Sequence, residues 1–255
     1  MNLYHYIVRL ADNSHILGHR LAEWCGHGPF LEQDMAMTNI ALDLIGQARS
    51  LYNLASEVQN EGKTEDDIAF LRYEYEYQNF LLVEQPNGDF ANTIVRQYFF
   101  SAYQLPYYKT LYENLQNKND HHLTELRGIL EKAIKEINYH LRWSGEWMIR
   151  LGNGTEESHQ RMVNAVQNLY KYTGELFIAD ETDDTSLQSG FGVLLPEVKK
   201  DFDKSLFYIM ERSGLTIPEN ETMQTGGKQG VHSEYLGYIL AEMQYMQRAY
   251  PNSKW

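Results

Sequence analysis

Hydrophobic residues recur every three or four positions through almost every long segment of the sequence, and this period constrains the fold most. It is clearest in two segments, at about 31–55 and about 123–151. One face of the first carries Met37, Ile40, Ala41, Leu44, Ala48 and Leu51, and one face of the second carries Leu130, Ala133, Ile137, Leu141, Ser144, Met148 and Leu151. No convincing run alternates with the two-residue period of a half-buried strand. The sequence therefore predicts an all-α protein.

Turn residues divide this pattern into about eight helices. Their expected ranges are about 4–23, 31–55, 65–84, from 90 onward, 123–151, 155–179, 196–212 and 232–249. Pro106 is expected to bend or restart the fourth helix, because proline lacks the N–H and its ring clashes with the preceding turn. Thr155 is expected to cap the helix that follows "GNGT". The segments "DETDDTSLQSGFG" (180–192) and "PENETMQTGGKQG" (218–230) are expected to be loops.

Length and composition limit the classes of protein. We find no repeat or flexible linker in the 255 residues, so one helical domain over 1–255 is the simplest expectation. The net charge of −13 argues against nucleic acids and anionic membranes as partners. The single cysteine, the absence of an export signal at "MNLYHYIVRL" and the absence of a long apolar run predict a cytoplasmic protein. The 19 tyrosines and 10 phenylalanines suit a protein with wet interfaces.

A carboxylate and an imidazole lie one helical turn apart in "KAIKEINYHLRW", at Glu136 and His140. A di-iron centre in a helix bundle takes a Glu from each of two helices and a Glu-x-x-His pair from each of the other two. The spacing of four between Glu136 and His140 differs from the spacing of three in that motif. Lys132 lies one turn earlier, so we expect Lys132 or another cation to pair with Glu136 in place of a metal.

The second helix lacks the partner motif. Asp43 stands where an acid is needed, but the residue three positions later is Gly46, and segment 31–55 contains no histidine. A six-ligand centre therefore cannot be assembled, and Asp43, Gly46, Glu136 and His140 are interpreted as remnants of a metal site. A mid-helix glycine costs about 1 kcal/mol relative to alanine. Gly46 thus predicts either a very close neighbouring helix or a local distortion.

Other histidines offer weaker candidates. Acid-x-x-His occurs only at Asp12/His15 and at Glu156/His159, and the second pair is expected on a solvated face. His15, His19 and Glu23 form a column that a metal can use, although polar surface is the commoner meaning. The alternative function is therefore a stand-alone di-metal oxidase or oxygenase using this column with Glu136 and His140. A third alternative is an acidic helical binding protein unrelated to oxygenases.

Two further motifs are interpreted as structural and not as functional. Cys25 adjoins His27, but a buried thiol is expected there and not a nucleophile. "TGGKQG" (225–230) lacks the spacing of a phosphate-binding loop and is expected to be a turn. Lys228 within it is the candidate contact for a partner or an anionic ligand.

Four long blocks of the sequence resemble the C subunits of bacterial phenylacetyl-CoA 1,2-epoxidases (PaaC), from the first helix to the last. They are "LAEWCGHGPFLEQDMAMTNIALDLIGQARSLY", "LLVEQPNGDFANTIVRQYF", "AIKEINYHLRWSGEWMIRLGNGT" and "TGGKQGVHSEYLGYILAEMQYMQR". The loop near 182–196 is the least characteristic part. The resemblance implies a ferritin-like helix bundle with additional helices and a degenerate di-iron site.

The resemblance also implies a role in a monooxygenase complex of aerobic phenylacetate catabolism. In that family the C subunit pairs with a catalytic A subunit, which carries the di-iron centre and binds the CoA thioester. A small B subunit and a reductase with FAD and a [2Fe–2S] cluster are the other components of the complex, which uses NADPH and O2 to epoxidise the ring of phenylacetyl-CoA. The chain itself is then expected to be a structural subunit with no catalytic, cofactor-binding or metal-binding residue.

Overall fold

The computed structural model describes residues 3–219, 221–251 and 253, and among these it contains helices and loops but no strand. The predicted all-α class is confirmed. The chain forms two compact units, residues 1–86 with 226–255 and residues 87–225, and each is described by itself. The single-domain expectation stays a prediction. No helix in the described part of the chain is long and apolar enough to cross a membrane.

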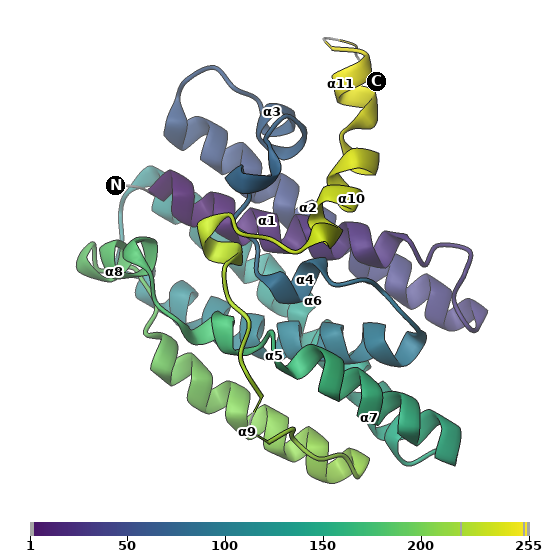
Figure 1. Cartoon of the computed structure of the whole chain (residues 1–255). Coiled ribbons are helices and arrows are strands. Elements are labelled where there is room, and N and C mark those ends of the chain that lie inside the picture. Colours follow the sequence, from purple (N-terminus) through teal and green to yellow (C-terminus); the bar gives the residue numbers. More distant parts are fainter. Residues whose placement is uncertain (1–2, 220, 252, 254–255) are drawn as a thin grey trace. The chain divides into compact units, whose positions relative to one another are not determined.

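The first unit is built on two long helices, α1 (Leu3–Ala22) and α2 (Leu31–Gln59), which run antiparallel (Figure 1). The helices approach closely at Gly18, where an added Cβ would lie 2.9 Å from Cγ1 of Ile45 and 3.3 Å from the carbonyl oxygen of Ala41. A larger residue at Gly18 would therefore push the pair apart. The buried faces of α1 and α2 are mostly apolar, but they also carry a polar group centred on Asp12 and the buried side chains of Arg9, Arg20 and Gln47.

Short elements cover this pair. They are α3 (Glu65–Phe70), the 3-10 helix η1 (Glu74–Glu76), α4 (Leu81–Glu84), the 3-10 helix η3 (Gly227–Gln229), α10 (Glu234–Met243) and α11 (Tyr245–Ala249). The single helices expected over 65–84 and over 232–249 are therefore wrong. Side chains of α1 explain the first break, because Asp12 accepts from the backbone N–H of Gln78 and Asn13 accepts from that of Phe80. Those amides are consequently not available for a continuous helix.

The second unit contains α5 (Phe90–Asn114), α6 (His121–Gly152), α7 (Glu156–Tyr170), the 3-10 helix η2 (Gly174–Phe177), α8 (Glu181–Gln188) and α9 (Leu195–Ser213). Helices α6, α7 and α9 all pack against α5 (Figure 1). Side-chain caps start several of them: Asp89, Asp120 and Thr155 each accept from the backbone N–H three residues later. The predicted cap at Thr155 is confirmed.

Two expectations for this unit are wrong, and a third is wrong in part. Helix α5 does not restart at Pro106, because the neighbouring Leu105, Tyr107 and Tyr108 are all buried and their packing offsets the lost hydrogen bond; the alternative of a bend at Pro106 stays a prediction. The segment expected to be a loop at 180–192 contains α8, which begins with a capping box between Asp180 and Asp183. The helix expected over 155–179 ends at Tyr170 and is followed by η2.

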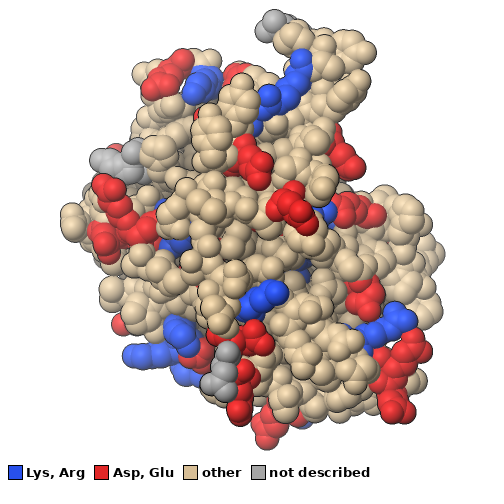
Figure 2. Space-filling view, in the orientation of Figure 1, with Lys and Arg blue, Asp and Glu red and all other residues tan. Residues whose placement is uncertain are grey.

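Charge on the surface follows the composition. Acidic side chains are spread over the face seen in Figure 2, as the net charge of −13 leads one to expect. Asp12 and His15 of the first unit, by contrast, are buried.

Candidate functional site

Asp12 lies on α1 with no exposed surface, and protein groups occupy both of its carboxylate oxygens. Oδ1 accepts from the hydroxyl of Tyr52 at 2.6 Å and from the guanidinium of Arg72. Oδ2 accepts from the other terminal nitrogen of Arg72 at 3.1 Å and from the backbone N–H of Gln78 at 2.9 Å. Four donors therefore saturate this carboxylate, and a metal would have to displace them.

Arg72 enters this cluster from the loop between α3 and η1. It also donates to the carbonyl oxygens of Ile68 and Glu76, and its guanidinium carbon lies 4.1 Å from the centroid of the Tyr77 ring. Burial opposes its charge, but the Asp12 carboxylate beside it raises the pKa of Arg72 above its usual value. Asp12 and Arg72 therefore form a buried ion pair with a nearly complete set of hydrogen bonds.

His15 and His19 continue the same face of α1. Their Nε2 atoms are 3.2 Å apart, and Nδ1 of His15 lies 3.3 Å from the hydroxyl of Tyr52. Because that hydroxyl donates to Asp12, it must accept from Nδ1 of His15, so Nε2 of His15 accepts from His19. Burial lowers the pKa of His15 well below its usual value, as do the neighbouring His19 and Arg72. Burial also lowers the pKa of His19 to about 4. Both imidazoles are therefore neutral at pH 7.

In the column expected to be polar surface, His15 is buried and His19 is half-buried, which corrects that interpretation for these two residues. Its last member, Glu23, is exposed and accepts from Arg20 at 2.8 Å, so it does not join the histidines. Within the described part of the first unit, no third acid or cysteine completes a ligand group with His15 and His19. A structural zinc site has four protein ligands and a catalytic one has three. The pair supplies only two.

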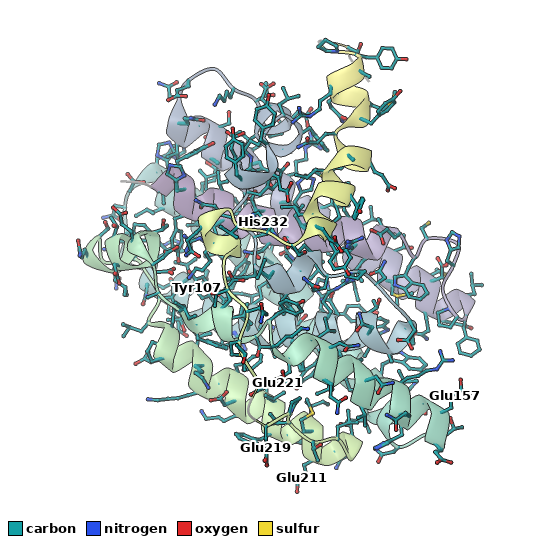
Figure 3. The ribbon with its side chains drawn as sticks, viewed as in Figure 1. Tyr107, Glu157, Glu211, Glu219, Glu221 and His232 are labelled. Atoms are coloured by element: carbon teal, nitrogen blue, oxygen red, sulfur yellow. The ribbon has the colours of Figure 1, made fainter. Side chains whose placement is uncertain are left out.

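A second buried ion pair joins α4 to the segment between η3 and α10. The Glu84 carboxylate accepts from the side chain of Asn79 at 2.9 Å, from Nδ1 of His232 at 2.8 Å and from the backbone N–H of Ser233 at 2.7 Å. Nε2 of His232 lies 2.9 Å from the carbonyl oxygen of Tyr77. Both ring nitrogens of His232 (labelled in Figure 3) face acceptors, so the ring is an imidazolium. Burial opposes this charge, but the hydrogen bond and charge of Glu84 raise the pKa of His232.

The remnants expected on α6 lie in the second unit. Nζ of Lys132 is 3.3 Å from Oε1 of Glu136, so the predicted ion pair is present. His140 is fully buried one turn later, and its carbonyl oxygen accepts from the hydroxyl of Ser144 at 2.7 Å. The interpretation of Glu136 and His140 as remnants of a metal site stays a prediction.

On α2, Asp43 is half-buried and Gly46 does not behave as expected. A Cβ added at Gly46 would meet no described heavy atom within 4 Å, and α2 continues through this position. Neither a close intramolecular neighbour nor a helix break therefore explains the glycine. The close approach of α1 and α2 occurs at Gly18 instead.

The remaining candidates are also placed. Cys25 is exposed, so the expected buried thiol is wrong. Lys228 is buried in η3, with its Nζ 5.9 Å from the centroid of the Phe80 ring. Its contact with CoA or a partner stays a prediction, and this burial weighs against it. Nδ1 of His159 lies 2.7 Å from the carbonyl oxygen of Gly152, while Glu156 is exposed.

Comparison with known proteins decides the family. Residues 1–255 match the family described as "Phenylacetic acid catabolic protein". The chain is also 46% identical over 250 residues to the C subunit of 1,2-phenylacetyl-CoA epoxidase from Escherichia coli (strain K12), and the alignment covers 98% of each chain. The chain belongs to the phenylacetic acid catabolic protein family. The resemblance seen in the sequence is confirmed, and the all-helical structure is consistent with the ferritin-like bundle of this family.

In this member of the family, sequence reasoning missed the partners that hold the buried acids. Neither Arg72, Tyr52 nor Glu84 belongs to a recognisable motif, and His232 stands out only as a helix start. Tyr52 is 40 residues from Asp12, and His232 is 148 residues from Glu84. No local spacing connects residues so far apart. The one available signal was the presence of charged residues inside otherwise apolar segments.

Proposed function

We propose that the chain is the structural, non-catalytic C subunit of a phenylacetyl-CoA 1,2-epoxidase complex in aerobic phenylacetate catabolism. The observation that carries this proposal is the 46% identity, over 98% of both chains, to a protein named as the C subunit of that epoxidase. Identity at this level over the full alignment supports the same place in the same complex.

The chemistry of the buried acids supports a non-catalytic role. Asp12 is saturated by Tyr52, Arg72 and Gln78, and Glu84 is held by Asn79, His232 and Ser233. A di-iron centre requires carboxylates whose oxygens are directed at metal ions. In the first unit, the oxygens of these two buried carboxylates are occupied by protein donors instead.

The proposed complex places the reactive groups on other subunits. The catalytic A subunit holds the di-iron centre and phenylacetyl-CoA, and a reductase with FAD and a [2Fe–2S] cluster delivers electrons from NADPH. The assembly also includes a small B subunit, and we place it in the cytoplasm. This chain holds none of these cofactors in the proposal.

The proposed contribution of the chain is mechanical. Catalytic side chains must be held within a fraction of an ångström of their working geometry, and packing around them supplies that rigidity. This chain is a helical protein with two buried ion-pair networks, and in the proposal it gives the helices of the catalytic partner a rigid surface to pack against. Loss of this support would leave the iron ligands in place but poorly ordered.

Reconstitution tests the proposal. The A and B subunits and the reductase are assayed for NADPH-dependent epoxidation of phenylacetyl-CoA with and without this chain. We expect activity only when the chain is present, and we expect the chain alone to be inactive. Full activity without it would overturn the structural role. Oxygen consumption by the isolated chain, together with bound metal, would instead support the stand-alone oxidase.

A further inference from the structure

The outer face of α2 carries an apolar surface that no part of the described chain covers. Leu31, Met35 and Leu42 are between 57% and 73% exposed, and Phe30 just before the helix is 64% exposed. Residues spaced by four and seven lie on the same face of a helix. Large exposed apolar side chains gathered on one face are typical of interaction sites.

Gly46 extends this face by one turn, since it follows Leu42 by four residues. Glycine destabilises the interior of a helix relative to alanine. At Gly46 nothing described in the chain lies within 4 Å of an added Cβ, so no internal contact requires the missing side chain. A small residue on an exposed helix face allows the backbone of another helix to come close. No contact within the described chain therefore explains the glycine.

Charge identifies the occupant of this face. Between Leu31 and Ser50 the sequence contains Glu32, Asp34 and Asp43 and a single cation, Arg49, which lies 3.8 Å from Glu65. A second copy of the chain would bring three acids against three acids with only Arg49 from each copy to offset them, and like charges at an interface are unfavourable. A helix that is apolar at its centre and flanked by Lys and Arg is complementary.

We infer that the α2 face, defined as Phe30, Leu31, Met35, Leu42 and Gly46, binds such a helix of the catalytic A subunit, with the closest approach at Gly46. This inference rests on the proposed function and adds the place and chemistry of the contact. Acids at the edge guide and orient the partner, while the apolar residues are desolvated. The close approach at Gly46 fixes where the two helices cross.

Binding of full-length variants to the catalytic A subunit tests the inference. Met35→Glu charges the apolar centre, and Gly46→Leu fills the point of closest approach. Each is expected to raise Kd by roughly tenfold or more, as loss of a desolvated anchor residue commonly does. Gly46→Ala is expected to weaken binding less, while raising the Tm of the isolated chain. Glu32→Lys is expected to weaken binding most at low salt.

Phe207→Lys is the matched control, because Phe207 is a 64% exposed apolar residue in the middle of another helix, α9. It should leave Kd unchanged. Circular dichroism of each isolated variant shows whether the chain still folds. If Gly46→Leu does not fold, Gly46→Ala and Glu32→Lys still test the inference.

The outcomes separate this inference from the proposed function. If the unmodified chain does not bind the A subunit, the proposed function fails as well. If it binds and the α2-face variants bind equally well, or if Phe207→Lys alone weakens binding, only the inference is overturned. Loss of self-association by the isolated variants, with unchanged binding to the A subunit, would assign the face to a second copy and would also overturn it.

Discussion

His232 and Glu84 form a buried ion pair in which Nδ1 of the imidazole lies 2.8 Å from Oε2 of the carboxylate. The other ring nitrogen lies 2.9 Å from the carbonyl oxygen of Tyr77. The pair joins segments 148 residues apart in the chain, and both side chains have no exposed surface. The protonation state of this pair connects the stability of the fold to pH.

The raised pKa of His232 predicts a loss of stability at alkaline pH. The folded state holds this proton more tightly than the unfolded state, whose pKa is near 6.5, so the contribution is fully present below pH 6.5. It is lost as the pH rises through the raised folded pKa. Urea unfolding measured from pH 6.5 upward should show that the free energy of unfolding of the unmodified protein declines, and that His232→Gln removes this decline.

His27→Gln is the matched control for that measurement, because His27 is exposed and its Nδ1 contacts only the carbonyl oxygen of Cys25 among its described hydrogen bonds. It should keep the alkaline decline of the unmodified protein. An identical pH dependence in His232→Gln and the unmodified protein would contradict the imidazolium assignment.

His15 and His19 predict the opposite trend at acid pH. Their folded pKa values are lowered, that of His19 to about 4, so the unfolded state takes up protons first as the pH falls below 6.5. Stability should therefore decline between pH 6.5 and about 4, and the His19 contribution to this loss is on the order of 2–3 kcal/mol. In His19→Gln the decline should be smaller by that amount; an unchanged acid slope would show that His19 is not held neutral.

The buried pair of Asp12 and Arg72 predicts strong and non-additive effects on stability. Asp12→Asn leaves the guanidinium without its counter-charge and should cost about 3–5 kcal/mol of unfolding free energy. Arg72→Met should cost a similar amount, while the double variant should cost clearly less than the sum. A double-mutant cycle by urea unfolding measures this coupling. Additive costs would mean that the two side chains do not act as a pair.

Lys132 and Glu136 form an ion pair of a different kind. The Lys132 side chain is 75% exposed, so water screens its attraction to Glu136 at 3.3 Å. Lys132→Met should therefore cost less than about 1 kcal/mol, as exposed pairs commonly do. A loss of several kcal/mol in the same unfolding assay would contradict this and would mean that the pair contributes as much as the buried pair of Asp12 and Arg72.

Local signals were sufficient for the helix class and for most of the long helices. The apolar period of α6 and the cap at Thr155 depend on residues a few positions apart, and both are found in the structure. The non-helical backbone at Gln78 and Phe80 was not predictable in this way. It depends on Asp12 and Asn13 of α1 binding these two backbone amides, 66 and 67 residues further along the chain.

The candidate site shows the same division between local and long-range information. The missing Glu-x-x-His motif at Asp43 and Gly46 is a local fact of the sequence, and it led to the expectation of a chain without its own iron. The burial of His15 and the pairing of Asp12 with Arg72 are tertiary facts, since these contacts join α1 to the loop after α3. From spacing alone, Asp12 and His15 were therefore expected on the surface. The packing of α1 against its neighbours buries them.

Iron analysis tests the central claim most directly. The full-length chain is purified alone and in complex with the A subunit, and iron per chain is measured in both samples by atomic emission. The account predicts well below stoichiometric iron in the isolated chain, and iron in the complex that the catalytic partner fully accounts for. Two tightly bound iron ions per isolated chain would contradict it.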